Sequence, residues 1–300
     1  MRRRHFLRNT ALTAGIFSLS PKDLLAALIQ QPAWKIRMLN KETGVFTERG
    51  GTILFAFTKE GIVVVDSQFP DQSQHLIDEL KKLSDNPFRL LINTHHHGDH
   101  TSGNISFKGI VPHVLAHKNS LKNQQKSAEA QKTEEKQLFP DQTYNDTWCE
   151  KIGKEKICLH YFGAAHTDGD SVVHLQHANI AHMGDLMFNR RHPFVDRSAG
   201  ASIKSWIEVL GKTVKKLDKK TKYVFGHSAE GYEITGNWED LEKFSEYLHN
   251  LLLFTESEIK AGKSKEEFIK TTVLPFETQW KGDGLARPLT AAYEELTLSK

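Results

Sequence analysis

Blocks of apolar and polar positions alternate along the first third of the chain, and they predict two strands, a helix and a further strand. Residues 52–57 and 61–66 are almost wholly apolar runs joined by a polar turn, as expected of buried strands. Residues 72–83 carry apolar side chains at helical spacing, and residues 89–93 form another apolar run. A helix between two strands of one sheet implies a crossover, so the strands at 61–66 and 89–93 are expected to be parallel neighbours.

The rest of the chain repeats this alternation. A polar stretch at 118–137, rich in Gln, Lys and Glu, predicts a solvent-facing helix over or beside a site, and residues 201–217 have one apolar helical face. From residue 238 the pattern is helical nearly to the end, with breaks at Pro275 and Gly282. Two strand-rich halves, each followed by helices, favour an α/β fold, a four-layered αβ/βα sandwich. The other predicted strands are residues 114–117, 159–162, 171–175, 180–185 and 223–227.

The segment around Gly153 is typical of a hairpin, with glycine at the first central position of a type II′ turn. Counting outward from the turn places Cys149 opposite Cys158 at a non-hydrogen-bonded position, within reach of a disulfide in an oxidising compartment. The same register places Lys151 opposite Lys156, which disfavours it, and a slip of one residue would separate the sulfurs. The sequence leaves both the disulfide and the free thiols open.

The amino-terminal segment differs in character from everything after it. A basic start that includes Arg3 and Arg4 is followed by a weakly apolar stretch and by small residues. This resembles a twin-arginine signal, so we expect a signal peptide at 1–26 and export of the folded protein by the twin-arginine machinery to the bacterial periplasm or beyond. An ordinary basic amino terminus is the alternative, and the stretch is too short for a stable membrane anchor. Residues 27–300 are expected to form one domain that ends in helices.

Removing the signal changes the charge of the chain. Residues 1–26 hold five basic side chains and one acidic side chain, so the formal net charge of +3 becomes about −1. A nearly neutral chain lacks the basic excess of proteins that bind nucleic acid or anionic membranes. The expected partner is therefore a small-molecule substrate, and the oligomeric state stays open.

Directly after the apolar run at 89–93, four side chains that bind metals fall within six residues: His95, His97, Asp99 and His100. Imidazole and carboxylate are zinc ligands, and the spacing His-x-His-x-Asp-His directs the first pair and the last pair to two different points. Two adjacent metal ions are therefore expected. A histidine-rich loop without metal is the alternative, which the further candidate ligands at later strand ends disfavour.

Those later strand ends carry His166, Asp185 and His227. Together with Asp66 and the histidine motif, they occur in the order in which the metallo-β-lactamase superfamily carries its motifs, so residues 40–230 resemble the binuclear, glyoxalase II-like branch of that superfamily. The resemblance implies the αβ/βα sandwich of this superfamily. The motifs that carry it are His95-x-His97-x-Asp99-His100, Gly163-x-x-His166, Met183-Gly184-Asp185 and Gly226-His227.

The resemblance also implies a ligand set for two Zn²⁺ ions, which iron or manganese could replace. A hydroxide shared by the ions would attack an ester, thioester, lactone or amide carbonyl, and Asp99 would be the catalytic residue that directs a proton to the leaving group. By the resemblance, one ion is held by His95, His97 and His166, the other by Asp99, His100 and His227, and Asp185 bridges them.

Asp185 distinguishes the branches of the superfamily. By the resemblance, an aspartate at this position belongs to thioesterases, lactonases and sulfatase-like or phosphodiesterase-like hydrolases, whereas dedicated β-lactamases carry Cys or Ser. Hydrolysis of β-lactams is then expected only as a side activity. A glyoxalase II-like thioesterase is an alternative that export disfavours, because its glutathione thioester substrate is cytosolic. A non-catalytic metal-binding scaffold is the remaining alternative, which the complete ligand set disfavours.

Other polar residues near these motifs are expected to play supporting parts. Asp66 is expected to orient a ligand or loop, and His96 to pack beside the site. Asp168 and Asp170 are expected to stabilise the loop that carries His166. The remaining strand histidines, His160, His174, His177 and His182, are expected to lie in the core or at the surface.

An arginine-rich segment, residues 189–197, follows the bridging aspartate in the sequence. Its arginines could accept an anionic group of the substrate. Equally, the segment could be a loop held by a salt bridge to Asp196.

Overall fold

The computed structural model describes residues 33–298. The features below are those of the compact unit Ile36–Lys300 and of Lys35, where its first strand begins. The expected signal peptide at 1–26 lies outside the described residues. Among the residues that are described, no helix has both the length and the apolar character needed to cross a membrane.

The first sheet contains seven strands in the order in which they occur along the chain. Its β2, β3 and β4 are antiparallel neighbours, whereas β4, β5, β6 and β7 are parallel. The crossover from β4 to β5 is made by α3 (Pro70–Leu83), which buries Leu76, Ile77 and Leu80. The strands are β1 (Lys35–Met38), β2 (Thr43–Thr47), β3 (Ile53–Thr58), β4 (Gly61–Val65), β5 (Phe88–Ile92), β6 (Val114–His117) and β7 (Gln142–Tyr144).

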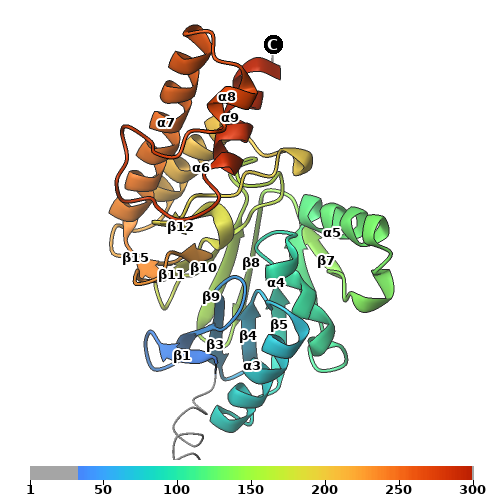
Figure 1. Cartoon of the computed structure of the whole chain (residues 1–300). Helices are drawn as coiled ribbons and strands as arrows, with labels where there is room; N and C mark the ends of the chain where they lie inside the picture. The colour runs from blue at the N-terminus through green and yellow to red at the C-terminus, as the bar shows by residue number, and fades with distance from the viewer. Residues whose placement is uncertain (1–32, 299–300) are drawn as a thin grey trace, which may run out of the picture. The chain divides into compact units, whose positions relative to one another are not determined.

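Short helical segments connect the last strands of this sheet. After β5 come α4 (Gly98–Thr101) and the 3₁₀ helix η1 (Ser102–Phe107), and after β6 come α5 (Lys118–Gln131) and η2 (Glu134–Lys136). In Figure 1, α3 and α4 lie on one side of the strands β3 to β5.

The second sheet contains six strands in the order β15-β13-β11-β10-β9-β8. Its β8, β9, β10 and β11 form an antiparallel meander, and β13 joins β11 in parallel. Two very short strands, β12 (Phe188–Asn189) and β14 (His227–Ser228), pair separately. The other strands are β8 (Thr147–Ile152), β9 (Glu155–His160), β10 (Val172–Leu175), β11 (Ile180–His182), β13 (Lys222–Val224) and β15 (Thr235–Gly236).

Helices follow the second sheet and cover its outer face. In Figure 1, α6 (Ile203–Lys216), α7 (Trp238–Lys260), α8 (Lys265–Phe268) and α9 (Ala286–Leu298) gather at one end of the unit. They enclose an apolar core with the outer face of the sheet, in which Trp206, Phe244 and Tyr247 are fully buried. Two short 3₁₀ helices, η3 (Gly184–Leu186) and η4 (Arg197–Ala199), lie between β11 and α6.

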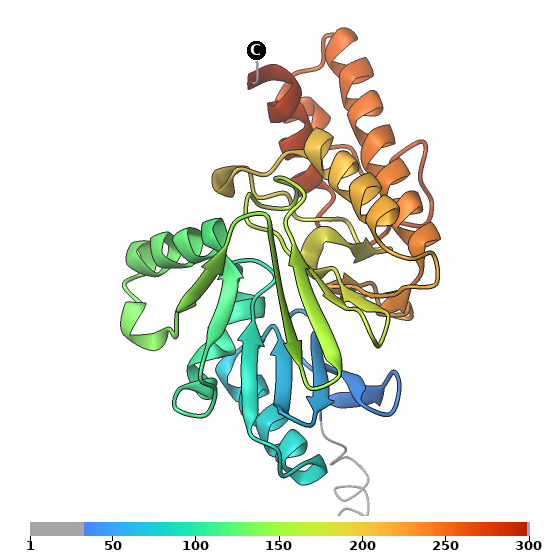
Figure 2. The ribbon, with the colours of Figure 1, turned by 180° about the vertical axis from the view of Figure 1, so that it is seen from behind.

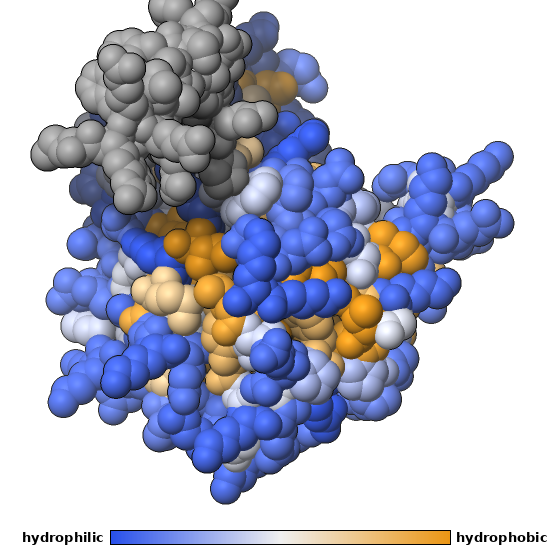
Figure 3. Space-filling model, turned by 90° about the horizontal axis from the view of Figure 1, so that it is seen from below, coloured by the Kyte–Doolittle hydropathy of each residue, from blue (hydrophilic) through white to orange (hydrophobic). Residues whose placement is uncertain are grey.

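A second apolar core lies between the two sheets. It joins side chains of the first sheet such as Val63 and Ile92 to side chains of the second such as Leu159 and Val173. Burial of apolar surface on both faces of each sheet holds the layers together. The unit is therefore the predicted αβ/βα sandwich. Seen from below, its surface is mostly hydrophilic, with hydrophobic residues gathered in a few patches (Figure 3).

Most of the predicted elements are confirmed, including the crossover and the parallel pairing of β4 with β5. Some predicted boundaries need correction. The predicted strand 180–185 ends at His182, and Asp185 lies in η3; the predicted strand 223–227 ends at Val224, and His227 belongs to the separate β14. The helical pattern from residue 238 is broken at Pro275 and Gly282 as predicted, but the non-helical part extends over the whole stretch between α8 and α9. Trp280 of that stretch packs into the core and donates its indole N–H to the Phe188 carbonyl (3.1 Å).

The hairpin β8–β9, seen from behind in Figure 2, has the predicted register. Gly153 has a φ of 61°, as the turn requires, and Cys149 pairs with Cys158 at a Cα–Cα distance of 4.2 Å. The two cysteines form a disulfide. Of the two alternatives left open by the sequence, the structure contains the disulfide.

Candidate metal centre

The predicted ligands converge because each follows the end of a strand at the same edge of the two sheets. His95 and His97 follow β5, and His97 is the N-cap of α4. His166 lies in the loop between β9 and β10, Asp185 lies in η3 after β11, and His227 is in β14. Loops at strand ends are held by rigid elements, which suits them to carry a site.

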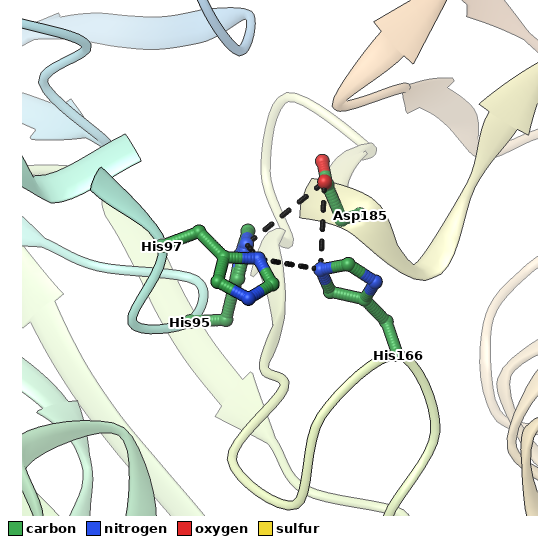
Figure 4. Close-up of side chains that lie close together, drawn as sticks. All are labelled: His95, His97, His166 and Asp185. Atoms are coloured by element: carbon green, nitrogen blue, oxygen red, sulfur yellow. Dashed lines mark hydrogen bonds and ion pairs between the residues drawn. The ribbon is translucent and has the colours of Figure 1, made fainter. Parts of the chain in front are cut away.

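Four side chains form one group, which we call the His95 cluster: His95, His97, His166 and Asp185 (Figure 4). The Nδ1 atom of His97 lies 3.1 Å from His95 Nε2 and 2.8 Å from His166 Nε2. The Oδ2 atom of Asp185 lies 3.5 Å from His166 Nε2 and 3.9 Å from His95 Nε2. One ligand atom of each residue therefore faces the same point.

The outer nitrogens of these rings are already engaged. His166 Nδ1 lies 2.8 Å from the Phe194 carbonyl oxygen, and His97 Nε2 lies 2.9 Å from the Asp196 carboxylate. Because both partners can only accept, each of these outer nitrogens carries the proton, and the inner nitrogens of His97 and His166 present lone pairs. Two acceptors 2.8 Å apart repel each other unless a cation lies between them.

Protonation of these rings does not relieve the repulsion. Burial, aided by the charge of His97, lowers the pKa of His166 to about 3. Burial, aided by the charge of His100, also lowers the pKa of His95 far below its usual range. Neutral imidazoles with converging lone pairs are the donor set of zinc, so the His95 cluster fits a divalent metal ion.

The second group, which we call the His100 cluster, consists of Asp99, His100 and His227. His227 Nε2 lies 3.1 Å from Asp99 Oδ2 and 3.5 Å from His100 Nε2. The ring of His227 stacks on Phe188 at a centroid distance of 5.4 Å, which fixes its orientation. This cluster offers two imidazole nitrogens and a carboxylate, a donor set that fits a second divalent ion.

Asp185 lies between the two clusters. Its Oδ1 atom is 3.0 Å from His100 Nε2 and 3.4 Å from His227 Nε2, while its Oδ2 atom faces the His95 cluster. The Oδ1 atom is buried, and its contacts are ion pairs with these two rings rather than well-aligned hydrogen bonds. A carboxylate with one oxygen toward each cluster is suited to lie beside a cation in both.

The carboxylates of the site stay ionised although burial opposes their charge. Burial tends to raise the pKa of Asp185, but the charges of His227 and His100 outweigh it and hold the pKa well below its usual range. Burial likewise opposes ionisation of Asp99, whereas the charge of His100 and a hydrogen bond from His227 lower its pKa to about 2. Both groups are therefore available as anionic ligands at neutral pH.

Charges also act on His100 and His227. Burial tends to lower both pKa values, but Asp185 outweighs it, raising the pKa of His100 well above its usual range and that of His227 to about 9. Without a metal ion, the His100 cluster therefore holds protons in the place of a cation. Binding of metal there must release protons.

Asp66 holds His100 from outside the cluster. Its fully buried carboxylate lies 2.7 Å from His100 Nδ1 and accepts hydrogen bonds from the Thr94 backbone N–H and hydroxyl, both at 2.8 Å. The backbone of Asp66 has a positive φ of 66°, a conformation that is unfavourable for this residue type and is maintained by these contacts. This geometry agrees with the prediction that Asp66 orients a ligand.

Gly51 lies so close to the His100 ring that a Cβ would overlap it.

The structure also brings in two residues that the sequence did not assign to the site. Asp196 was expected only as a salt-bridge partner of the arginine-rich loop, but its carboxylate faces His97 and accepts from the Ser198 hydroxyl (2.6 Å). Phe194 holds His166 through its carbonyl, and its ring lies 5.4 Å from the His97 ring. No sequence signal separated these residues from the rest of the loop.

The three arginines of this loop have different surroundings. Arg190 is buried, lies over the Trp280 ring at 4.4 Å, and has one Nη atom without a hydrogen-bond partner among the described residues. Arg191 is exposed, and Arg197 forms a salt bridge with Glu295. Within residues 33–298 no salt bridge joins any of the three to Asp196, so the structure does not contain the expected salt-bridged loop.

The remaining polar residues named from the sequence lie around the site or away from it, and none of them belongs to the two clusters. Asp170 accepts from the backbone N–H and hydroxyl of Thr167, and the Asp168 carboxylate accepts from the Asn123 amide. His96 is largely buried and its Nε2 lies 3.6 Å from Asp196. Of the other strand histidines, His160 and His182 are buried, His174 is half-buried and His177 is exposed.

Comparisons with known proteins agree with this geometry. The family model of the Metallo-beta-lactamase superfamily matches residues 47–227. Among solved structures, a metallo-beta-lactamase from Pontibacter korlensis has a similar fold, with a TM-score of 0.61 and 21% sequence identity over 72% of this chain and 99% of that one. The metallo-beta-lactamase IND-7 is also similar, with a TM-score of 0.60 and 21% identity over 73% of this chain and 100% of that one. No curated protein matches the sequence.

Proposed function

Since this chain belongs to the metallo-beta-lactamase superfamily, whose members are mostly metal-dependent hydrolases, we propose that it is a binuclear zinc hydrolase of carbonyl substrates. The proposed ligands are His95, His97 and His166 for one ion, Asp99, His100 and His227 for the other, and Asp185 between them. Iron or manganese could occupy the same positions.

The observation that carries the proposal is the position of Asp185. One oxygen of its carboxylate faces each cluster, with Oδ1 3.0 Å from His100 Nε2 and Oδ2 3.5 Å from His166 Nε2. A monodentate ligand of a single ion would need only one of these oxygens. Apart from the shared Asp185, each cluster supplies three ligands, which would leave room for water and substrate, as in catalytic rather than structural zinc sites.

Two bound divalent ions would supply a nucleophilic hydroxide at neutral pH and a Lewis acid for the carbonyl oxygen. The protein's own residues then position the substrate and move protons. The Asp99 carboxylate is the most exposed of the predicted ligands: its side chain is 32% exposed, whereas no other side chain of the two clusters is more than 17% exposed. It can therefore reach a leaving group and direct a proton to it, as proposed from the sequence.

The proposed substrates are esters, thioesters and lactones, with amides as a further class. By its resemblance to the superfamily, an aspartate between the clusters distinguishes this chain from dedicated β-lactamases. A β-lactam side activity is the second candidate, because both similar solved structures are metallo-beta-lactamases. A glyoxalase II-like thioesterase would require a cytosolic substrate. A non-catalytic scaffold would not need two ligand sets that leave room for water and substrate.

Metal content and hydrolysis together test the proposal. Metal-free protein reconstituted with Zn²⁺ should bind two equivalents, measured by atomic absorption, and should hydrolyse at least one member of a panel of 4-nitrophenyl esters, thioesters, lactones and nitrocefin. Asp185→Asn should lower hydrolysis by at least a hundredfold, because the amide cannot serve both clusters as an anion. Asp78→Asn, at an exposed helix position, is the matched control. One equivalent of zinc, or full activity of Asp185→Asn, would refute the binuclear mechanism.

We also propose that the protein is exported through the twin-arginine machinery and acts in the periplasm. The basic start of the sequence supports this, and so does the disulfide between Cys149 and Cys158, a bond typical of oxidising compartments. Replacing Arg3 and Arg4 by Lys should retain the protein in the cytoplasm, as measured by cell fractionation. Equal periplasmic amounts of both forms would contradict this route.

A further inference from the structure

The carboxy-terminal helix α9 and the loop after Asp185 enclose a groove beside the His95 cluster. Its volume is about 300 Å³, large enough for the side group of a small substrate. Four of its eight lining residues are apolar, and five of the eight come from α9, which lies outside the residues 47–227 that match the superfamily model. The apolar residues are Phe194, Val195, Ala286 and Ala291, and the others include Arg287 and Thr290.

Phe194 joins this groove to the metal centre. Its ring lies 5.4 Å from the His97 ring and 6.0 Å from the His166 ring, and it also lines the groove. The residue is 39% exposed, unusually open for a phenylalanine that contacts the fully buried His166 and the partly buried His97. A substrate held at the His95 cluster would therefore pass along this ring before reaching the groove.

Arg287 gives the groove a positive charge. Its guanidinium carbon lies 6.0 Å from the centroid of Phe194, and the side chain is exposed. Within the described part of the chain, no carboxylate forms an ion pair with Arg287. The guanidinium is thus available for an anionic group and is already oriented over an aromatic ring.

The other two charged residues of the groove, Arg197 and Glu294, are each paired with a residue of opposite charge. Arg197 donates to the Ala201 carbonyl (2.7 Å) and forms a salt bridge with the buried Glu295. Glu294 forms a salt bridge with Lys265 of α8. The net charge presented by the groove is consequently that of Arg287.

From these contacts we infer that the groove is a specificity subsite for the substrate of the proposed hydrolase, and that it takes an apolar side group ending in a carboxylate. This inference rests on the proposed function, since the group must belong to a molecule that is hydrolysed at the His95 cluster. The apolar part would pack on Phe194 and Val195, and the carboxylate would bind Arg287. Arg287 and Phe194 are then the residues that select the substrate.

Matched substrate pairs test the inference with the zinc-loaded full chain. In the acyl arm, mono-4-nitrophenyl glutarate is compared with 4-nitrophenyl pentanoate, which has a methyl group in place of the carboxylate. In the leaving-group arm, 4-acetoxybenzoate is compared with 4-methylphenyl acetate. We expect a preference for the anionic member in one arm, which also identifies the part of the substrate that enters the groove.

Arg287→Gln should abolish that preference by lowering kcat/KM for the anionic substrate about five- to tenfold, the loss of one charge-assisted contact at a partly exposed site. The neutral partner should be unaffected, and Arg287→Lys should recover part of the preference. Lys243→Gln, which removes one exposed positive charge of α7 outside the groove, is the control. Thr290→Phe, which fills the groove, should raise KM for the longer substrate and leave 4-nitrophenyl acetate unchanged.

A binding measurement separates this inference from the proposed function. Saturation-transfer NMR with metal-free protein should detect 4-phenylbutyrate more strongly than 4-phenyl-1-butanol, and Arg287→Gln should remove the difference. Hydrolysis of neutral and anionic esters with equal efficiency, together with Arg287-independent binding, would overturn the subsite while leaving the hydrolase intact. Hydrolysis of no member of the ester, thioester, lactone and nitrocefin panel by the zinc-loaded protein would refute carbonyl hydrolysis and with it the assignment of the groove to a substrate.

Discussion

Two carboxylates outside the metal clusters, Asp66 and Asp196, should each control the affinity of one cluster. Asp66 lies 2.7 Å from His100 Nδ1, and Asp196 lies 2.9 Å from His97 Nε2. Each fixes which ring nitrogen carries the proton and so which nitrogen is free for a metal ion. Replacing either by asparagine keeps the shape of the side chain but changes its hydrogen bonds.

In Asp66→Asn, one acceptor oxygen becomes an N–H₂ group. If it replaces Oδ2, a donor is placed 2.7 Å from the His100 Nδ1–H and 2.8 Å from the Thr94 hydroxyl oxygen. A neutral His100 relieves the donor–donor contact by carrying its proton on Nε2, the atom that should bind metal, rather than on Nδ1. Changes of this kind typically cost tenfold to a hundredfold in metal affinity, about 1.4–2.8 kcal/mol.

The two variants are each other's controls. Titration of metal-free protein with Zn²⁺ against a chromogenic chelator should give two affinities, and imidazole NMR signals identify the cluster that fills at each step. Asp66→Asn should weaken binding at the His100 cluster alone, and Asp196→Asn should weaken binding at the His95 cluster alone. If each variant weakens both steps equally, or neither step changes, the two carboxylates do not act through the histidines that they contact.

Three further perturbations have outcomes that follow from the structure. Replacing Cys149 by Ser and Cys158 by Ala removes a bridge of sequence separation 9 and should lower the free energy of unfolding by about 2–3 kcal/mol, measured by urea denaturation. Burial raises the pKa of Asp170 to about 8, above its unfolded value near 3.9, so this group costs stability progressively as pH rises from about 4 to 8. Metal-free Asp170→Asn should therefore gain stability relative to the wild type between pH 5 and pH 8, and a constant difference in thermal midpoint would contradict this. Gly51→Ala should weaken zinc at the His100 cluster at least tenfold in the same chelator titration, because the added Cβ overlaps the ring of His100; unchanged affinity would show that the loop can move aside.

The sequence was sufficient to predict features that depend on local order. The hairpin around Gly153 has the predicted register because the turn fixes the pairing by simple counting, and the cysteine pair follows from it. The predicted ligands meet because strand ends of a layered α/β fold lie at a common edge. In both cases the information needed was contained in short segments.

Features that depend on contacts between distant segments were not predictable. Asp196 lies 99 residues from His97, in a loop without periodicity that could mark its position. The helix α5 was predicted from a polar pattern, but the pattern did not show that its buried face would include Ser120, Asn123 and Gln124, which have polar partners rather than an apolar core. Hydrophobic periodicity cannot identify a face that is buried through hydrogen bonds.

The loop after Asp185 combines two tasks that are usually separate. Its residues Phe194 and Asp196 hold the outer nitrogens of His166 and His97, while the Phe194 ring lines the groove beside α9. A change in this loop therefore alters metal affinity and substrate choice together. Arg287 and Thr290 of α9 line the groove and form no hydrogen bond or ion pair with the proposed ligands in the described part of the chain, so substitutions there are expected to change specificity while the metal centre is preserved. If the groove is the proposed subsite, relatives of this chain that differ in substrate should differ in α9 more often than in the loop.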